Sequence, residues 1–471
     1  MVVGDITTGT DVVVIGAGPG GYTAAIRASQ KGKDVVLVEK EKVGGICLNH
    51  GCIPAKALIH AAGFKKDIEH WDEIGIHTEG IDVEFSEIQK WKDSAVKRLD
   101  NGVLNMLDHH NVEYMEGEAR FLDSNTIRVE EEHNAENVEF EKAIIATGSQ
   151  PIEIPGLEFD KDRVISSREV LELDEVPDEI VVVGGGYIGM EAVTKFCKFG
   201  ATVKVVEARE RVLGMFEEEV VNSIQETSDM YEDEIYTSAK AQDVEYRDDG
   251  KPVLVAEQDG EKLKLEGDYI LVAAGRETRP VLGNLSLENT DVEINEDGFV
   301  EVDEKMQTGD NSILCIGDAA GEPLLAHKAY REGKVAGEVV AGKPAAFDND
   351  YIPAVMYTDP EVATVGLNEE DAREEYDELK VGKFPMSASG RALSTNKEAG
   401  YVKVVADKDE KLLGVQIVSA RASDMIAEAT LALEMNAYLD DIANTIHAHP
   451  TFPEALCDAA EAAKGDSIHS Y

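Results

Sequence analysis

The chain has 471 residues, enough for about three domains, and 43% of them are hydrophobic, which suffices for several buried cores. Lysine and arginine number 45 against 94 acidic residues, and the net charge of −49 argues against nucleic acid or an anionic membrane as a partner. The acidic residues are spread along the chain rather than gathered in a tail, which favours an acidic surface over an ordinary fold, as expected of a halophilic protein from a high-salt interior.

Targeting and cysteine patterns bear on the cellular compartment. No basic segment precedes an apolar run at the N-terminus and no apolar stretch reaches 18 residues, so we expect a soluble, cytoplasmic protein without a membrane partner. The five cysteines are too few and scattered for a disulfide scaffold and do not cluster as zinc ligands. We therefore expect Cys197, Cys315 and Cys457 to be small buried side chains and predict no metal site.

The first motif is a dinucleotide fingerprint. The expected strand, glycine turn, helix and second strand span residues 11–15, 16–21, 22–31 and 35–38. Gly16 permits the tight turn, Gly18 lets the backbone approach a pyrophosphate, and Gly21 lets the helix pack against the strand. Glu39 lies 23 residues after Gly16, where a carboxylate can accept hydrogen bonds from ribose hydroxyls.

Two cysteines, Cys47 and Cys52, follow the fingerprint at a spacing of five residues. Pro54 fits the first turn of a helix that continues over residues 55–62, so Cys52 is expected at the helix start, where the helix dipole lowers the pKa of a thiol. A regular helix separates residues five apart by about 7.5 Å along its axis, which is too far for relaxed disulfide geometry. We therefore expect Cys47 in a loop or distorted turn, which Gly51 permits.

The segment after the cysteines is predicted to form long helices over residues 64–110, with Trp71 and Trp91 as packing residues. Short strands are then expected at residues 113–121, 126–129 and 143–146. Pro151 and Pro155 mark a linker.

A second copy of the fingerprint follows this linker and is an internal repeat. Its strand, helix and second strand are expected at residues 180–183, 190–199 and 203–206, around a turn made of Gly184, Gly185, Gly186, Tyr187, Ile188 and Gly189. Glu207 again follows the first glycine by 23 residues, and a carboxylate there favours NAD because it repels the 2′-phosphate of NADP. Arg209 and Arg211 leave NADP open, since arginines can bind that phosphate.

The last third contains further short motifs. A strand over residues 268–274 ends at Gly275 and Arg276, and another over residues 313–316 precedes Gly317 and Asp318. From residue 352 the sequence pattern changes. Strands with an alternating pattern are expected at residues 401–405 and 412–418, followed by helices from residue 423. Near the end, His449 is followed by Pro450 and Thr451, and a carboxylate, Glu454, lies five residues after it.

Taken in this order, the motifs resemble those of the flavoprotein disulfide reductases over nearly the whole chain. The marks are the two glycine turns, the cysteine pair, Ala146-Thr147-Gly148, Gly317-Asp318, Tyr357-Thr358-Asp359-Pro360-Glu361 and His449-Pro450-Thr451. The resemblance implies an α/β fold with two Rossmann-like dinucleotide-binding domains, for FAD and NAD, and a C-terminal α+β dimerisation domain. The expected boundaries are an FAD-binding domain in two parts at residues 1–150 and 278–350, an NAD-binding domain at 151–277 and a dimerisation domain at 351–471.

The resemblance also implies roles for individual residues. Cys47 matches the interchange thiol, and Cys52 matches the charge-transfer thiol beside the flavin. Lys56 matches the lysine that pairs with a glutamate, here Glu191. His449 matches the catalytic base and Glu454 the carboxylate that orients it, while His447 is expected to be structural.

The same resemblance assigns cofactor contacts. Those to FAD are Gly16, Gly18, Gly21, Glu39, Lys56, Ala119, Thr147, Gly148, Asp318 and Ala326. Those to NAD are Gly184, Gly186, Tyr187, Ile188, Gly189, Glu207, Gly275 and Arg276.

The implied reaction is the FAD-dependent oxidation of a protein-bound dihydrolipoyl group by NAD. The implied partners are a second copy of the chain, in a homodimer, and a lipoyl-bearing domain of a 2-oxoacid dehydrogenase complex or a glycine cleavage system. The alternative is a glutathione reductase or another low-molecular-weight disulfide reductase, which Glu207 and the acidic surface oppose. A non-enzymatic, cofactor-holding protein would leave the two cysteines and His449 without a use. His50 and Ala55 are unusual residues for the family within the cysteine motif.

Overall fold

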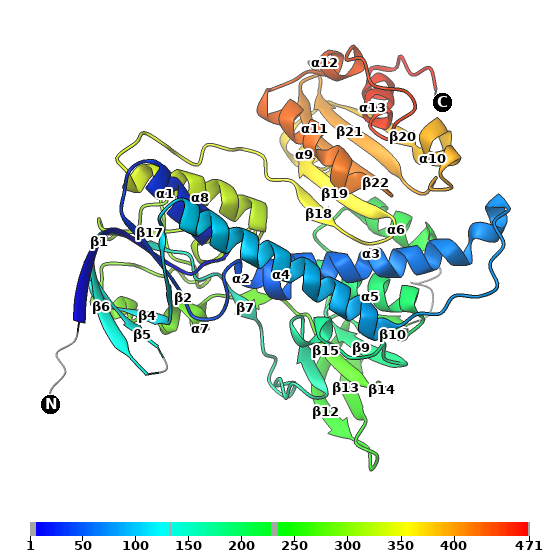
Figure 1. The fold of residues 1–471 in the computed structure, drawn as a ribbon. Helices are drawn as coiled ribbons and strands as arrows, with labels where there is room; N and C mark the ends of the chain where they lie inside the picture. Colours follow the sequence, from blue (N-terminus) through cyan, green and yellow to red (C-terminus); the bar gives the residue numbers. More distant parts are fainter. Residues whose placement is uncertain (1–5, 132, 228–233, 470–471) are drawn as a thin grey trace.

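Three sheet-centred units make up the molecule (Figure 1). The computed structural model describes residues 6–131, 133–227 and 234–469. The sheet of the first unit is mainly parallel with an antiparallel β4-β5-β6 edge, the main sheet of the second is parallel, and that of the third is antiparallel. The third unit lies over the second, beside helices α3 (Cys52–Glu69) and α6 (Glu218–Thr227).

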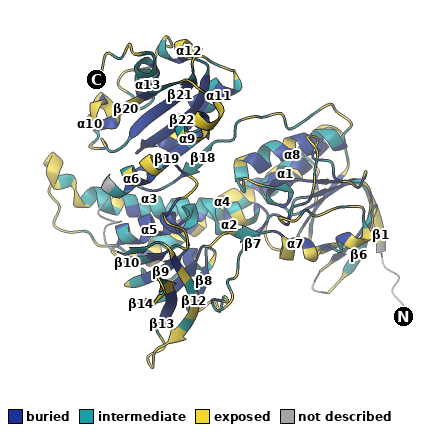
Figure 2. Cartoon of the chain, turned by 180° about the vertical axis from the view of Figure 1, so that it is seen from behind, coloured by how far each residue is buried: buried dark blue, intermediate teal, exposed yellow. Residues whose placement is uncertain are grey.

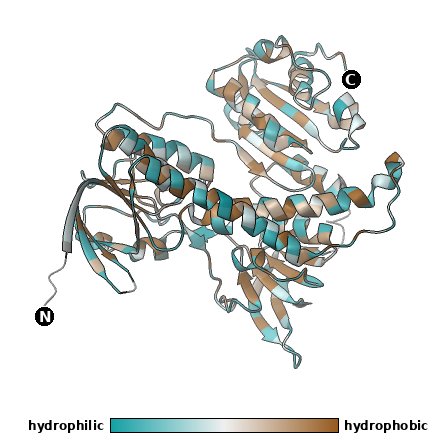
Figure 3. Cartoon of the chain, in the orientation of Figure 1, coloured by the Kyte–Doolittle hydropathy of each residue, from teal (hydrophilic) through white to brown (hydrophobic). Residues whose placement is uncertain are grey.

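The first unit contains a seven-stranded sheet in the order β3-β2-β1-β6-β5-β4, with β17 beside β6. Its strands are β1 (Ile6–Ile15), β2 (Val35–Glu39), β3 (Glu113–Glu116), β4 (Glu118–Asp123), β5 (Thr126–Glu130), β6 (Ala135–Ile145) and β17 (Ile313–Cys315). The valines of β1 are fully buried because helices cover the sheet, which explains the continuous apolar run. In Figure 3 the hydrophobic colour is most continuous along strands of the second and third units.

Some helices of the first unit carry the cysteines and others cover the sheet. They are α1 (Pro19–Gln30), α2 (Gly45–His50), α3, η1 (Trp71–Ile74), α4 (Phe85–His109), α7 (Arg279–Gly283), η4 (Leu287–Asn289), η5 (Gly317–Ala320) and α8 (Ala326–Val340). Helices α1 and α8 pack closely against each other. A Cβ placed on Gly333 would lie 2.4 Å from the carbonyl oxygen of Gly20, so the close approach depends on glycine at this position.

The second unit has a five-stranded parallel sheet in the order β11-β10-β9-β15-β8. Its strands are β8 (Val164–Ser166), β9 (Glu179–Val183), β10 (Thr202–Val206), β11 (Ile235–Tyr236) and β15 (Tyr269–Val272), and its helices are η2 (Glu169–Leu171), α5 (Tyr187–Phe199) and α6. The short strands β7 (Gln150–Pro151) and β16 (Arg276–Glu277) pair where the chain enters and leaves this unit.

The third unit is an antiparallel sheet in the order β18-β19-β22-β21-β20. Its strands are β18 (Ala354–Met356), β19 (Glu361–Gly366), β20 (Leu379–Pro385), β21 (Tyr401–Asp407) and β22 (Leu412–Ser419). Its helices are α9 (Glu369–Glu375), η6 (Met386–Ala388), α10 (Gly390–Ser394), α11 (Ala422–Glu434), α12 (Leu439–Ala443) and α13 (Glu454–Lys464). Figure 2 shows its central strands buried between the helices and the rest of the molecule.

Several local expectations differ from the structure. An antiparallel sheet of β12 (Ala239–Tyr246), β13 (Pro252–Gln258) and β14 (Glu261–Glu266) was not expected within the second unit. Trp91 packs only partly: 47% of its surface is exposed, and its ring centroid lies 6.4 Å from that of His60 on α3. Cys315 is fully buried as expected, whereas Cys197 and Cys457 are only partly buried. None of the helices in the described ranges is long and apolar enough to cross a membrane.

Candidate functional site

The cysteine pair sits at a break between two helices. Cys47 lies in the short helix α2 rather than in the expected loop, and α3 begins at Cys52. Between them Gly51 adopts φ −148° and ψ −110°, which interrupts the helical path and brings the second cysteine back toward the first. Both residues are thiols in this structure, and their side chains form a hydrogen bond with each other. A helix break therefore achieves what the loop was expected to do.

The two thiols have opposite proton affinities. The hydrogen bond from Cys47, followed by the positive charge of Lys56, lowers the pKa of Cys52 to about 7 despite burial. The same hydrogen bond, together with burial and the negative charge of Cys52, raises the pKa of Cys47. Cys52 is therefore the group that carries the thiolate near neutral pH, with Cys47 as its proton-bearing donor.

An ion pair lies directly beside Cys52 and joins the first two units. Nζ of Lys56 on α3 is 2.9 Å from Oε1 and 2.8 Å from Oε2 of Glu191 on α5. Glu191 is buried, and it also accepts a hydrogen bond from the backbone N–H of Tyr357. Lys56 lies over the ring of Tyr357 at 4.7 Å. Burial disfavours the charge on Lys56, but Glu191 more than offsets this and raises its pKa, so the cation persists next to the thiolate.

The first glycine turn is as tight as the spacing predicts. Gly16 has φ +100°, and a Cβ on Gly21 would lie 1.8 Å from the carbonyl oxygen of Gly16. Gly18 starts α1 in an extended conformation, and a Cβ there would meet no described heavy atom within 4 Å. Oε2 of Glu39 accepts a hydrogen bond of 2.7 Å from the N–H of Ala17, which fixes the carboxylate against the turn.

The second glycine turn reproduces this geometry. Gly184 has φ +107°, and a Cβ on Gly189 would lie 2.0 Å from the carbonyl oxygen of Gly184. Gly186 starts α5 in an extended conformation, again with open space where its Cβ would be. Oε2 of Glu207 accepts a hydrogen bond of 2.6 Å from the N–H of Gly185. The two halves of the internal repeat therefore present the same set of donors and the same open glycine.

A cavity of about 650 Å³ connects the first turn with the cysteines. Among the residues singled out from the sequence, its walls include Gly16, Gly18, Glu39, Cys47, Cys52, Lys56, Ala119, Thr147, Gly148, Tyr187, Ile188, Glu191, Arg276, Asp318 and Ala326. Those outside its walls are Gly21, Gly184, Gly186, Gly189, Glu207, Gly275, His449 and Glu454. Most residues expected to contact FAD thus share one cavity. The glycines of the second turn and Glu207 lie outside it, whereas Tyr187 and Ile188 of that turn line its wall.

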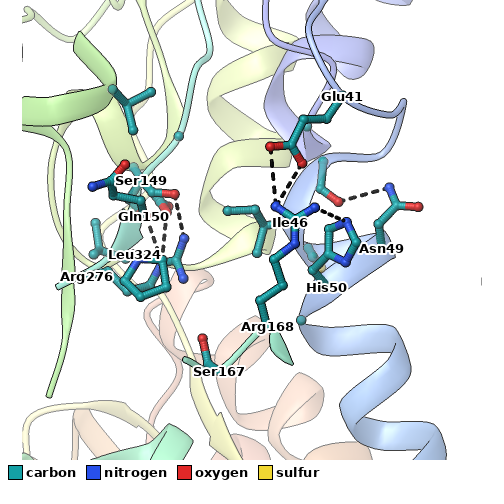
Figure 4. Close-up of a pocket in the computed structure, with 18 of the residues that line it drawn as sticks. Glu41, Ile46, Asn49, His50, Ser149, Gln150, Ser167, Arg168, Arg276 and Leu324 are labelled. Carbon is teal, nitrogen blue, oxygen red and sulfur yellow. Dashed lines mark hydrogen bonds and ion pairs between the residues drawn. The ribbon is translucent and has the colours of Figure 1, made fainter. Parts of the chain in front are cut away.

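Two polar groups of the cavity were not expected from the sequence. On one wall, the hydroxyl of Ser149 donates to Asp318 at 2.5 Å and accepts from Nε of Arg276 at 2.8 Å (Figure 4). On the other, Arg168 contacts Glu41 and His50 (Figure 4). Ser149 directly follows the Ala146-Thr147-Gly148 motif, but no motif contains Glu41 or Arg168, whose contact joins segments far apart in the sequence. The unusual His50 was the one available signal.

His449 and Glu454 form a separate pair on the third unit. Nδ1 of His449 is 2.8 Å from Oε1 of Glu454, whose Oε2 accepts a hydrogen bond of 2.6 Å from the N–H of Thr451. The Thr451 and His449 contacts outweigh burial and lower the pKa of Glu454, which keeps it an anion that accepts the Nδ1 proton. This tautomer leaves Nε2 as the basic nitrogen. The His449 side chain is 78% exposed and lies outside the cysteine cavity of its own chain.

His447, by contrast, is held by its neighbours. Its ring nitrogens are 2.9 Å from the carboxylate of Glu428 and 2.9 Å from the carbonyl oxygen of Thr445, and its side chain is buried. These contacts agree with a structural role.

Comparisons with known proteins agree along the whole chain. The family model described as pyridine nucleotide-disulphide oxidoreductase matches residues 10–333, and the dimerisation domain of the same family matches residues 352–460. The chain is 46% identical to a dihydrolipoyl dehydrogenase of Halobacterium salinarum, covering 100% of this chain and 99% of that protein. It is 45% identical to the dihydrolipoyl dehydrogenase of Geobacillus stearothermophilus over the same shares.

Solved structures show the same fold. The flavoprotein disulfide reductase RclA of Escherichia coli, described as HOCl-induced, superimposes with a TM-score of 0.85 at 25% identity, over 96% of this chain and 99% of that one. LpdA of Mycobacterium tuberculosis superimposes with a TM-score of 0.89 at 22% identity over the same shares.

Proposed function

The chain belongs to the pyridine nucleotide-disulphide oxidoreductase family, and from this we propose that it is a dihydrolipoyl dehydrogenase, which oxidises protein-bound dihydrolipoyl groups with NAD as acceptor. The observation that carries the proposal is the Cys47–Cys52 pair, next to the Lys56–Glu191 ion pair and in the same cavity as a dinucleotide turn. The full-length relatives from salt-loving archaea and from bacilli support the dihydrolipoyl substrate.

The residues of the first unit fit FAD. Gly18 leaves open space at the start of α1, where backbone N–H groups can bind a pyrophosphate. Oγ1 of Thr147 is buried without a hydrogen-bond partner among the described residues, so a donor or acceptor is missing beside Gly148. Glu39, Ala119 and the other cavity residues expected from the sequence would hold the cofactor. When bound, FAD supplies the two-electron chemistry that links a dithiol to a nicotinamide.

NAD fits the second turn for the same physical reasons. Gly186 leaves the pyrophosphate position open at the start of α5. Glu207 is fixed by the N–H groups of Gly185 and Arg209, so its carboxylate is oriented in advance for a ribose diol. A 2′-phosphate would meet this carboxylate, and we propose NAD rather than NADP as the coenzyme.

The thiol chemistry follows from the two pKa directions. One thiolate of the dihydrolipoyl substrate attacks the sulfur of Cys47 in the Cys47–Cys52 disulfide, and the sulfur of Cys52 leaves as a thiolate stabilised by Lys56. The second substrate thiol then attacks the substrate sulfur of the mixed disulfide, closing the lipoyl ring and releasing Cys47 as a thiol. His449, oriented by Glu454, accepts the proton of the attacking substrate thiol and supplies one to Cys47.

The position of His449, exposed and outside the cavity of its own chain, supports a site shared between two chains. A dimerisation domain covers residues 352–460, and the same region exposes large apolar side chains. Ile446 is 96% exposed, Met435 73% and Leu431 64%, which is typical of an interface that is open in a single chain. We propose that His449 and Glu454 of one subunit complete the cysteine site of the other in a homodimer.

Subunit mixing tests this shared site. An inactive Cys47→Ser chain and an inactive His449→Gln chain are mixed under exchange conditions, with tags that verify hybrid formation. Each hybrid has one intact site and one doubly damaged site, so up to half of the normal activity per dimer is expected to return. Verified hybrids without activity would place His449 with its own chain's cysteines.

Paired assays test the reaction itself. The account expects rapid NAD-linked oxidation of dihydrolipoamide and NADH-linked reduction of lipoamide, with little NADPH-linked reduction of glutathione. Glutathione reduction with NADPH as the faster reaction would overturn the proposal in favour of a low-molecular-weight disulfide reductase. A lipoylated carrier domain, offered in place of free lipoamide, tests the proposed protein partner.

A further inference from the structure

An arginine of the second unit reaches into the first at the side of the cofactor cavity. Arg168 lies between β8 and η2, and its guanidinium is 3.0 Å from the carboxylate of Glu41, which follows β2. The same guanidinium is 3.1 Å from Nε2 of His50, the last residue of α2 (Figure 4). The contact therefore joins two units through groups that flank the cysteine helices.

The arginine is held in place by its own segment. Its backbone N–H donates to the hydroxyl of Ser166, and the N–H of Ser166 donates to the carboxylate of Glu169 at 3.0 Å. Because these hydrogen bonds close the turn around Arg168, the side chain leaves the second unit from a fixed point. Whether the guanidinium of Arg168 contacts Glu41 therefore depends on how the two units are placed relative to each other.

His50 takes part as an acceptor. A guanidinium only donates hydrogen bonds, so Nε2 of His50 accepts and the ring is neutral with its proton on Nδ1. Burial, followed by the charge of Arg168, lowers the pKa of His50, which keeps this neutral form dominant at neutral pH. The charged groups that act on the ring are Arg168, Glu41, Glu172 and Lys42.

The three residues lie at the outer edge of the cavity. All three line the cavity whose inner walls hold Gly16, Gly18 and the cysteines. The side chains of Arg168 and Glu41 are 45% and 46% exposed, so their contact faces solvent while its other side faces the cavity. The contact is therefore a partly exposed part of the wall of the cavity that holds the first glycine turn.

We propose that Arg168 is a positioning residue that latches the second unit to the first across the edge of the FAD cavity, through Glu41 and His50, and thereby slows release of the cofactor. The inference rests on the proposed binding of FAD to the first unit. The latch binds no reacting atom, and its opening changes how long the cofactor stays rather than the chemistry of the thiols.

Cofactor release measures the latch directly. The release rate is followed by the rise of free-flavin fluorescence after the holoenzyme is diluted, for the native chain and for Arg168→Ala, Arg168→Lys and Glu41→Gln. Arg168→Ala loses both contacts and is expected to release FAD about three- to tenfold faster, with smaller increases for the other two variants. The matched control is Arg247→Ala, which removes an exposed arginine–glutamate pair with Glu266, away from the cavity, and should leave the rate unchanged.

Acidification separates a latch from a merely structural arginine. Protonated His50 can no longer accept from Arg168, so release by the native chain is expected to accelerate as the pH falls from about 7 to about 5. His50→Gln keeps an acceptor that does not titrate, and should release FAD at the native rate at neutral pH without the acid increase. An acid increase that persists in His50→Gln, or release from Arg168→Ala at the native rate, would overturn the latch.

The outcomes distinguish the latch from the proposed function. A chain that binds FAD but does not oxidise dihydrolipoamide would contradict the proposed function and leave the release experiment valid. A chain that oxidises dihydrolipoamide and releases FAD at the same rate with and without Arg168 would contradict the latch alone. A chain that binds no FAD would overturn both.

Discussion

The two glycine turns of this chain have nearly the same geometry but different surroundings. Both begin with a left-handed glycine and end with one that has no room for a Cβ, at 1.8 Å in the first unit and 2.0 Å in the second. In both, a glutamate 23 residues after the first glycine accepts hydrogen bonds from the turn, through Glu39 at 2.7 Å and Glu207 at 2.6 Å. Equal spacing in the sequence has produced equal geometry.

The surroundings of the two turns differ. The first is covered by α2 and α3, by η5 and α8, and by the segment that carries Arg168, which together close a cavity around it. Burial of Glu39 is deep enough to raise its pKa despite three backbone hydrogen bonds. The glycines of the second turn and Glu207 lie outside that cavity, which only Tyr187 and Ile188 of that turn reach. We infer that the glycine turn recognises a dinucleotide, whereas the segments packed over the turn determine whether the bound dinucleotide stays or exchanges.

The largest effect is expected at Cys47, which lies in one of the helices packed over the first turn. Cys47→Ser removes the sulfur that the substrate attacks, so dihydrolipoamide oxidation should fall by about 10³-fold or more while FAD stays bound. Steady-state rates and the flavin content of the purified variant check both parts. Cys457→Ser is the matched control, because that thiol lies outside the cavity and its pKa is raised to about 11, and it should keep full activity.

A matched pair of glycine substitutions comes next and separates the two turns. Gly21→Ala and Gly189→Ala each force a methyl group onto a carbonyl oxygen, at a cost of about 3 kcal/mol or more, which is over 100-fold in binding. Gly21→Ala should lose FAD, and Gly189→Ala should keep FAD but lose NAD, as measured by flavin content and NAD titration.

The control for this pair is Gly102→Ala in the middle of α4. No described heavy atom lies within 4 Å of a Cβ at Gly102, so this change should leave both cofactors bound and stabilise the helix by about 0.5–1 kcal/mol. Equal losses of both cofactors in Gly21→Ala and Gly189→Ala would show that the turns are not independent.

A smaller effect is expected at the carboxylate of the second turn. Glu207→Ala removes a hydrogen bond to the ribose and the repulsion of a 2′-phosphate together, so NAD use should fall and the handicap of NADP should shrink, each by about 1–3 kcal/mol. The ratio of kcat/KM for the two coenzymes measures this. A native enzyme that already prefers NADP would contradict the assignment of Glu207.

The smallest effect concerns the ion pair that joins the two units. The reactive thiolate of the reduced enzyme should disappear as the pH falls through about 7, because Cys52 is then protonated. Lys56→Met removes a cation that favours the thiolate and should raise this midpoint by about one unit. The pH dependence of Cys52 alkylation, followed by peptide mass mapping, gives the midpoint.

Lys66→Met on the outer part of the same helix is the control for this change. Its side chain is 43% exposed and its contact with Glu69 is 3.9 Å long, so the Cys52 midpoint should not move. Equal shifts in both variants would mean that Lys56 acts through general charge rather than through its place beside Cys52.

The sequence predicted the parts of the molecule that local rules determine. The glycine spacing and the apolar runs located both turns, both glutamates and most strands of the main sheets in the first two units. Pro54 located the start of α3 near Cys52. The roles of these residues in binding and catalysis stay predictions until they are tested.

Features that depend on distant contacts were not predicted. Cys47 was expected in a loop, but one irregular residue, Gly51, separates two helices instead. The hairpin of β13 and β14 is an exception, because a local signal for it exists: Asp259-Gly260, both with positive φ, joins an apolar run to the alternating residues 261–266. Contacts such as Ser149 with Asp318 and Arg168 with Glu41 join residues more than 100 positions apart, and no local pattern encodes them.

The most direct measurement is the nucleotide content of the purified native protein after exhaustive gel filtration. The comparison of the two turns predicts about one FAD per chain and no retained nicotinamide, followed by full dihydrolipoamide oxidation once NAD is added back. Nicotinamide that stays with the protein, or FAD lost as readily as NAD, would contradict the claim that the cover around each turn, rather than the turn itself, decides which dinucleotide stays.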